Sequence, residues 1–236
     1  MKIKIRGKEF VVEDTHESFW KGISEWEPGT FAAMKYFIKP DKPYIDIGAW
    51  IGPTVLYGAS LTSSRVYAIE PNPDSFAILK RNLELNKSKA HISHTALDPF
   101  CCKLPLSIPE EGSQSSFYPH KKEKKRVIVQ GTSFDCWKMQ VGTEEVDKCN
   151  FVKMDIEGAE AEVIPSMTKW LRTFKPTLCI SLHPHICLVD KVMGCIYFYK
   201  HFYFENGRKT SLCEIARELK EKKGTITLIC SEEEWK

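Results

Sequence analysis

Two short apolar segments end in acidic and glycine residues, and they constrain the fold more than any other feature of the chain. The first is Tyr44–Gly52 (YIDIGAWIG), and the second, about a hundred residues downstream, is Phe151–Glu160 (FVKMDIEGAE). Each pattern predicts a buried strand followed by a turn into a helix. Ligands of open α/β sheets bind outside the carboxyl ends of the strands, so we expect both acidic turns to face one crevice. The pair predicts an enzyme that binds a nucleotide-like cofactor beside a polar reaction site.

Strand and helix signals alternate along the rest of the chain. Apolar runs predict further strands at 65–69, 91–97 and 178–182, and helices at 53–61 and 73–86, the second capped by Asn72. Strands alternating with helices predict an α/β fold with a mostly parallel, doubly wound sheet. We expect further elements around this core, namely a leading strand or hairpin at 2–12, a small β insertion at 104–108 and 126–129, a helix at 211–223 and a closing strand at 225–230.

The length of 236 residues predicts a single domain over 1–236. Within it, we expect an N-terminal strand and helix extension (1–40), a cofactor-binding core (41–184) and C-terminal helices with the closing strand (185–236).

The composition excludes several classes of protein. A hydrophobic fraction of 42% suits a packed core, and a net charge of +3 is too small to indicate a nucleic-acid partner. No stretch approaches the ~20 apolar residues that span a bilayer, and the nine cysteines include no C-x-x-C pair, which indicates reduced thiols and a cytoplasmic protein. The basic run 121–126 is typical of a solvated loop, with a patch for an anionic substrate as the alternative.

The glycine-rich turn predicts what kind of cofactor binds. Its D-x-G-x-x-x-G form places Asp46 where a pyrophosphate would be repelled, so a cationic group such as an amino-acid ammonium fits better. Glu70, 24 residues later, ends the next predicted strand, where a carboxylate can accept both ribose hydroxyls. A ribonucleoside that carries a positively charged amino acid describes S-adenosylmethionine.

Three segments together resemble the FkbM family of S-adenosylmethionine-dependent O-methyltransferases: Ile45–Gly52, Ala68–Asn72 and Val152–Glu160. The similarity extends over about residues 26–184. It implies the Rossmann-like class I methyltransferase fold and methylation of an oxygen, commonly on sugars, glycolipids or glycosylated natural products. By motif position it implies that the cofactor contacts the following residues: Asp46, Gly48, Ala49, Trp50, Gly52, Glu70, Pro71, Asn72, Ala96 and Asp155.

Two positions depart from the family pattern. Trp50 stands where the family usually has a small polar residue, and Ser181 stands where a glutamate is common. The first is expected to reshape the pocket for the methionine part of the cofactor. The second removes one acidic group from the acceptor side.

Three side chains are candidates for activating the acceptor. Asp155 and Glu157 follow the fourth predicted strand of the sheet, and His183 ends the fifth. A histidine with an ordinary pKa near 6.5 accepts a proton at neutral pH, so we expect His183 to be the base, with Glu160 structural. The same carboxylates with His183 or His185 form an alternative site for a divalent cation, but no spacing motif requires one and we expect a metal-free reaction.

Aromatic residues offer faces to a sugar ring, with core packing as the alternative for each: Trp26, Trp50, Phe117, Tyr118 and Trp137. The run Ile196–Phe204 is aromatic enough to predict core packing or a homodimer contact. We therefore expect an O-methyltransferase that acts on a hydroxyl of a sugar in a glycan or a glycosylated small molecule. Two rivals remain: an RNA methyltransferase, and a non-catalytic S-adenosylmethionine-binding module of a glycan-synthesis assembly.

Overall fold

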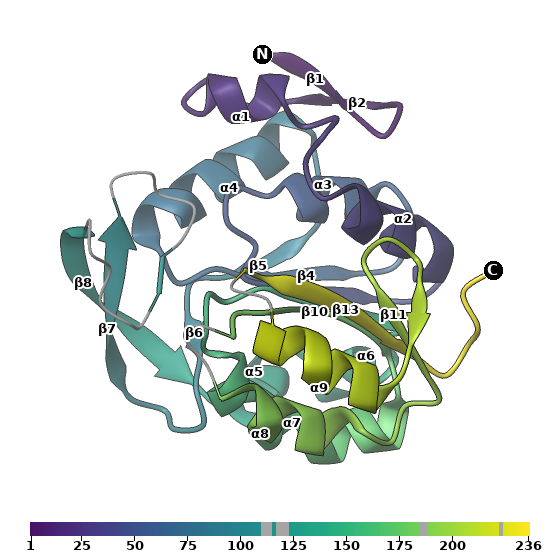
Figure 1. Ribbon diagram of the computed structural model, residues 1–236. Helices are drawn as coiled ribbons and strands as arrows, with labels where there is room; N and C mark the ends of the chain where they lie inside the picture. The colour runs from purple at the N-terminus through teal and green to yellow at the C-terminus, as the bar shows by residue number, and fades with distance from the viewer. Residues whose placement is uncertain (110–114, 117–122, 185–187, 222–223) are drawn as a thin grey trace.

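The computed structural model describes residues 1–109, 115–116, 123–184, 188–221 and 224–236 (Figure 1). The helices are α1 (Glu17–Lys21), α2 (Pro28–Phe37), α3 (Pro53–Ala59), α4 (Pro73–Leu85), α5 (Phe134–Val141), α6 (Thr143–Asp147), α7 (Glu160–Phe174), α8 (Val189–Ile196) and α9 (Leu212–Glu221). The strands are β1 (Lys2–Ile5), β2 (Lys8–Val11), β3 (Tyr44–Ile47), β4 (Val66–Ile69), β5 (His91–Ser93), β6 (Ala96–Leu97), β7 (Lys103–Pro109), β8 (Glu123–Thr132), β9 (Phe151–Met154), β10 (Thr177–Leu182), β11 (His201–Phe204), β12 (Lys209–Thr210) and β13 (Ile226–Ser231).

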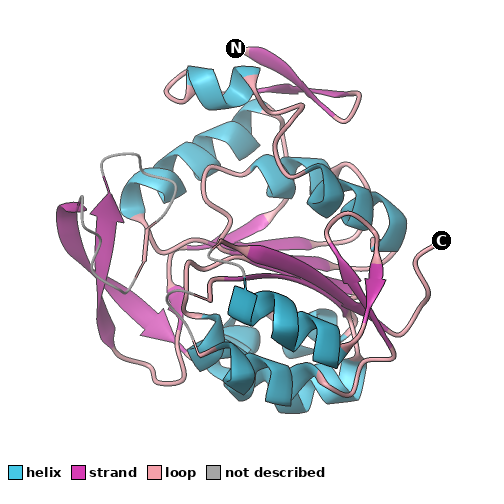
Figure 2. Ribbon diagram, viewed as in Figure 1, coloured by secondary structure: helices cyan, strands magenta, loops and turns pink. Residues whose placement is uncertain are grey.

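An eight-stranded sheet with the order β12-β11-β13-β10-β9-β3-β4-β5 forms the centre of the molecule. The five strands from β10 to β5 run parallel, whereas β13, β11 and β12 add antiparallel pairs at one side. Helices α2, α3 and α4 cover one face and α5 to α9 cover the other (Figure 2). The predicted α/β fold with a mostly parallel sheet is confirmed.

The inner strands are apolar because both of their faces are covered. Every residue of β3, β4, β9 and β10 is buried. The order of the strands brings β3 between β4 and β9, so the turns that follow these three strands meet at one edge of the sheet.

One predicted strand is divided in the structure. We expected a continuous strand over 91–97, but β5 pairs with β4 in the central sheet, while β6 pairs with β8 in a separate three-stranded sheet, β6-β8-β7. The chain leaves the central sheet between these two short strands to build the predicted β insertion. The insertion therefore stands against the carboxyl edge of the central sheet at β5 (Figure 1).

The predicted hairpin at the N-terminus is β1 and β2, and it lies over the helical layer that contains α4. Helices α1 and α2 follow it within residues 1–40, the range for which we expected a strand and helix extension. In the run Ile196–Phe204, five of the nine residues are buried, which supports the core alternative, although Tyr197 is 53% exposed. No helix in the described ranges combines the length and the apolar character needed to cross a membrane.

Candidate functional site

Two cavities lie side by side at the carboxyl edge of the central sheet and share one wall. The narrow cavity, of about 50 Å³, lies toward β4 and the insertion, and its lining includes Ile69, Glu70 and Ala96. The wide cavity, of about 350 Å³, lies toward β10 and β13, and its lining includes Lys153 and His183. The residues that line both cavities are Gly48, Trp50, Asp155 and Glu157.

A glycine brings two of the strand-end turns into contact. Gly48 follows β3 with a φ of +83°, and a Cβ atom placed on it would lie 1.9 Å from the carbonyl oxygen of Asp155. The backbone N–H of Asp155 in turn donates to the carbonyl of Ile47 at 3.0 Å. Only a residue without a side chain allows this approach, so the glycine predicted from the motif sets how closely the turns after β3 and β9 pack.

Glu70 directly follows β4 and lines the narrow cavity, and its carboxylate is fixed by backbone groups. It accepts hydrogen bonds from the N–H groups of Trp50 and Asn72, each at 2.8 Å. Burial raises the pKa of Glu70 to about 7, and these two hydrogen bonds oppose the increase. Pro71 and Ala96 line the same cavity, so an acidic group stands beside an apolar surface.

Asp46 is placed differently from the expectation. Its side chain is fully buried and lines neither cavity, because Lys153 on the neighbouring strand β9 lies opposite it with Nζ 3.9 Å from Oδ1. The hydroxyl of Tyr44 donates to the other carboxylate oxygen at 2.6 Å. Direct contact between Asp46 and a cofactor ammonium is therefore not supported, and the carboxylate instead balances a buried lysine.

Gly52 and Asn72 also line neither cavity. Gly52 precedes α3 with a φ of +96°, and the Asn72 side chain caps α4 by accepting from the N–H of Asp74 at 3.0 Å. Both shape the loops that carry lining residues. Of the remaining predicted contacts, Ala49 lines the wide cavity.

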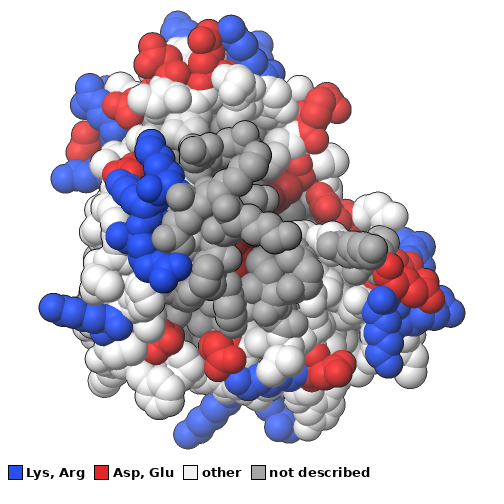
Figure 3. All heavy atoms as spheres, turned by 60° about the vertical axis from the view of Figure 1, so that its left-hand side comes forward, with Lys and Arg blue, Asp and Glu red and all other residues white. Residues whose placement is uncertain are grey.

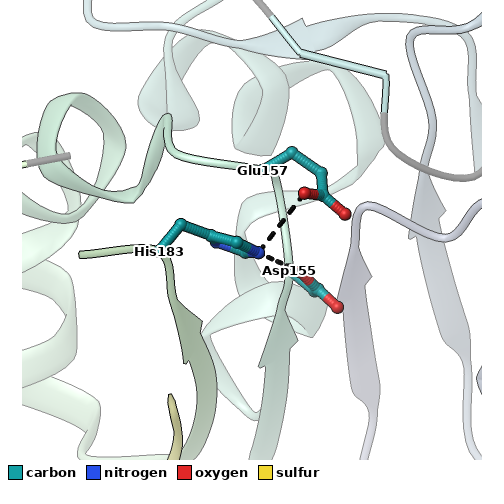
Figure 4. Close-up of side chains that lie close together, drawn as sticks. All are labelled: Asp155, Glu157 and His183. Carbon is teal, nitrogen blue, oxygen red and sulfur yellow. Dashed lines mark ion pairs between the residues drawn. The ribbon is translucent and has the colours of Figure 1, made fainter. Parts of the chain in front are cut away.

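The three candidate catalytic side chains converge at the wall between the cavities (Figure 4). The Nε2 atom of His183 lies 3.6 Å from Oδ1 of Asp155 and 3.4 Å from Oε2 of Glu157. Its Nδ1 atom lies 3.1 Å from Oε1 of Glu160, a fully buried residue at the first position of α7. The same Glu160 oxygen accepts from the N–H of Ile156 at 3.1 Å, which ties the side chain to the turn before α7.

The surrounding carboxylates change the protonation of His183. Burial would lower its pKa, but the hydrogen bond to Glu160 and the charges of Glu160, Asp155 and Glu157 raise the pKa to about 9. Burial, with the charge of Asp155, raises the pKa of Glu157 to about 7. A raised pKa makes His183 a poorer proton acceptor at neutral pH than a histidine with the ordinary value, so the ordinary pKa that we expected for it is not supported.

Two charged residues of the wide cavity, Lys153 and Glu27, were not predicted from the sequence. Lys153 is 4% exposed; burial would lower its pKa, but Asp46, Asp155 and Glu27 raise it above the usual value for lysine. Glu27 has a φ of +40°, and its Oε2 atom is buried without a hydrogen-bond partner among the described residues. A lysine inside an apolar strand was a usable signal for the first. Glu27 lies far along the sequence from Lys153 and His183, and only the fold brings it to the same cavity.

The predicted aromatic residues separate into two groups. Trp26 and Trp50 line the wide cavity together with Phe19. The ring centroid of Phe19 lies 5.3 Å from that of Trp26 and 4.5 Å from that of Trp50. Trp137 instead belongs to the core, with its indole N–H donating to Ser93 at 3.0 Å. Phe117, Tyr118 and the alternative ligand His185 lie outside the described residues.

The described part of the basic run, Lys124–Arg126, is exposed at the start of β8 instead of forming a loop. Figure 3 shows Lys and Arg side chains gathered on this side of the molecule. Lys125 pairs with Asp74, with Nζ 2.6 Å from Oδ2, so part of the charge is balanced across the surface to α4.

A family model of the methyltransferase FkbM domain matches residues 46–223, which is 178 of the 236 residues. The chain belongs to the FkbM methyltransferase family. The predicted resemblance is thereby confirmed, and S-adenosylmethionine is the cofactor that membership in this family implies.

A solved structure of low sequence identity shares the fold of the chain. An rRNA methylase from Streptococcus thermophilus matches with a TM-score of 0.50 and 9% identity, over 86% of this chain and 95% of that one. A methyltransferase FkbM from Methylobacillus flagellatus matches with a TM-score of 0.49 and 16% identity, over 81% of this chain. This chain spans only 44% of that protein's length. No curated protein sequence matches the chain. The predicted Rossmann-like class I methyltransferase fold is confirmed.

Proposed function

We propose that this FkbM family member is an S-adenosylmethionine-dependent O-methyltransferase, and that it methylates a hydroxyl of a sugar in a glycan or a glycosylated small molecule. One observation carries the proposal. Asp155 and Glu157 line both cavities, so a group bound in the narrow cavity meets the contents of the wide cavity at two carboxylates. We also propose that residues 1–236 act as one methyltransferase domain.

The residues of the narrow cavity fit the nucleoside part of the cofactor. Glu70 offers an acid at a strand end, and Ile69, Ala96 and Leu97 offer an apolar surface for a base. Because ligand pockets usually measure about 300–1,000 Å³, the cavity of about 50 Å³ has to widen when a nucleoside enters. The methionine part would then reach the shared wall beside Gly48 and Trp50.

The chain's own residues hold the acceptor and take its proton. When bound, the cofactor supplies a methyl group whose bond to sulfur breaks, with the electron pair staying on sulfur, as the acceptor oxygen forms its bond to carbon. Asp155 and Glu157 lie where the acceptor hydroxyl has to approach, and a carboxylate there can accept the hydroxyl proton. Alignment of the two reactants supplies much of the remaining rate increase.

The wide cavity is lined by polar, acidic and aromatic side chains that suit the hydroxyls and the C–H face of a sugar. Polar groups for hydroxyls are present on β10 and β13, and carboxylates are present at Glu27 and Glu205. The rings of Trp26, Trp50 and Phe19 offer flat surfaces for the C–H face of a pyranose. These polar residues are Ser181 in β10, Thr227 in β13 and Thr225, which directly precedes β13.

The direct test is incubation of the purified chain with methyl-labelled cofactor and a panel of glycans and glycosylated small molecules. We expect label in a methyl ether on at least one sugar, and at least a hundred-fold less label from Asp155→Asn, the scale of a lost proton acceptor. Cofactor binding without transfer to any member of the panel would favour the non-catalytic module. Salt-dependent binding and labelling of RNA would favour the RNA methyltransferase.

A further inference from the structure

We propose that Asp155, Glu157 and His183 form a binding site for a divalent cation in the wide cavity. The site stands on its own geometry, and only its use in activating the acceptor rests on the proposed function. It replaces the metal-free reaction that we expected from the sequence. Three features support the site: the positions of the ligand atoms, the group that orients the histidine and the charge around it.

Two strand ends direct suitable ligand atoms toward one point (Figure 4). One carboxylate oxygen each from Asp155 and Glu157 and one ring nitrogen of His183 lie within 4.8 Å of one another. Two ligands bound at about 2.1 Å lie at most about 4.2 Å apart, and the two distances from Nε2, 3.6 Å and 3.4 Å, already satisfy this limit. The carboxylates are 21% and 19% exposed, so they have room for the small movement that closes the set.

A fully buried carboxylate orients the histidine as metal sites require. Glu160 lies 3.1 Å from Nδ1 of His183 and is itself fixed by the backbone N–H of Ile156. When Nδ1–H donates to this carboxylate and a cation displaces the proton on Nε2, the lone pair of Nε2 faces Asp155 and Glu157. Carboxylates that hold the second ring nitrogen in this way are common behind metal-binding histidines.

Acidic side chains outnumber lysines in the described lining of the wide cavity. Glu27 and Glu205 add two carboxylates to its lining, whereas Lys153 is turned toward the other oxygen of Asp155, Oδ2, at 3.9 Å. The Oδ1 atom of Asp155 is buried and accepts no hydrogen bond from a described residue. A cation at the three ligand atoms would satisfy this oxygen and separate the two carboxylates electrostatically.

Two carboxylates and one imidazole, with open cavity on the remaining side, suit Mg²⁺ or Mn²⁺ with water or an acceptor oxygen in the other positions. A cation there would fix the acceptor hydroxyl beside the shared wall and make it more acidic. The proton would still leave to a carboxylate or to water, and the methyl group would still come from the cofactor. The inference therefore adds a positioning ion and leaves the proposed transfer unchanged.

The test is a titration of the chelator-treated full chain with Mn²⁺, without cofactor or acceptor, followed by the loss of the free-ion electron paramagnetic resonance signal. We expect one site per chain, loss of that site in Asp155→Asn and in His183→Ala, and a 10–100-fold weaker site in Glu160→Gln. Glu162→Gln is the matched control, because Glu162 lies on the same helix and pairs on the surface with Lys191. This variant should bind Mn²⁺ as the wild type does.

Circular dichroism melts identify variants that fail to fold, and Glu157→Gln provides a third ligand change if either of the first two does. Absence of wild-type Mn²⁺ binding at millimolar concentration, or equal binding by the folded ligand variants, would overturn the cation site. Because no methyl transfer is measured, this result is independent of the proposed function. Conversely, transfer that proceeds unchanged in excess chelator would remove the catalytic use of the ion and leave the methyltransferase proposal standing.

Discussion

The two cavities differ in how they are built, although they share a wall. The narrow cavity is shaped by backbone: the glycine turn after β3 and the two N–H groups that hold Glu70. The wide cavity is shaped by charged side chains from distant parts of the chain, among them Glu27, Lys153 and His183. Cofactor binding and acceptor activation should therefore respond to different substitutions in the same molecule.

The largest expected effect tests the wide cavity. His183→Ala should lower turnover by about 10²–10⁴-fold, because it removes one ligand of the proposed cation beside Asp155 and Glu157. The Kd for the cofactor should change by less than about threefold, because His183 lines only the wide cavity. Steady-state kinetics and calorimetry measure the two quantities. Ser181→Ala, in the preceding strand, is the control and should keep turnover within about tenfold. A fully active His183→Ala variant would exclude any essential role for this side chain.

A glycine substitution tests the backbone of the shared wall. Gly48→Ala should lower the free energy of unfolding by about 3 kcal/mol, since the added methyl group would meet the Asp155 carbonyl at 1.9 Å in a left-handed conformation. Gly207→Ala is the matched control, because Gly207 has a φ of +80° with no atom within 4 Å of the added group. It should cost about 1 kcal/mol. Equal losses in urea unfolding would show that the close approach contributes nothing.

A substitution of Glu70 tests the narrow cavity. Glu70→Ala should weaken cofactor binding by about 1.5–3 kcal/mol, the scale of a hydrogen bond to a charged group, with little change in the KM for the acceptor. Calorimetry with the demethylated cofactor gives the affinity without turnover. Wild-type affinity in this variant would remove Glu70 from the cofactor site.

The smallest expected effect is the pH dependence of stability. The pKa of Glu70 rises from 4.5 to about 7 on folding, so its stabilising contribution is complete below pH 4.5 and is lost as the pH rises through 7. Glu70→Gln should therefore reduce the decrease in unfolding free energy between pH 5 and pH 8. Urea unfolding of both proteins at these two pH values measures the difference. An unchanged slope in Glu70→Gln would assign the pH dependence to other groups.

The same contrast explains what the sequence could predict. Strands β3 and β9 begin at Tyr44 and Phe151, where the two segments with acidic turns predicted buried strands, because strands buried on both faces are mostly apolar. The positions of Gly48 and Glu70 followed from local turn chemistry. The buried position of Asp46 could not be predicted in this way, because it depends on which strand becomes the neighbour of β3 and on the lysine that this strand carries.

The sequence predicted three residues of the acceptor side, but not the carboxylate of Glu27 or the protonation that these residues give one another. Asp155, Glu157 and His183 were expected in one crevice, and the structure brings them together. Glu27 joins them through a left-handed turn before α2, more than 120 residues away along the chain, which no local pattern reports. The pKa of His183 likewise depends on carboxylates whose distances only the folded chain defines.

The central claim is that the cofactor occupies the narrow cavity and meets the acceptor at the wall formed by Asp155 and Glu157. A crystal structure of the chain with the demethylated cofactor tests it most directly. We predict that the ribose hydroxyls contact Glu70, that the sulfur lies at the wall, and that the wide cavity stays open beside His183. A nucleoside found in the wide cavity, against Lys153 and Trp26, would contradict the account.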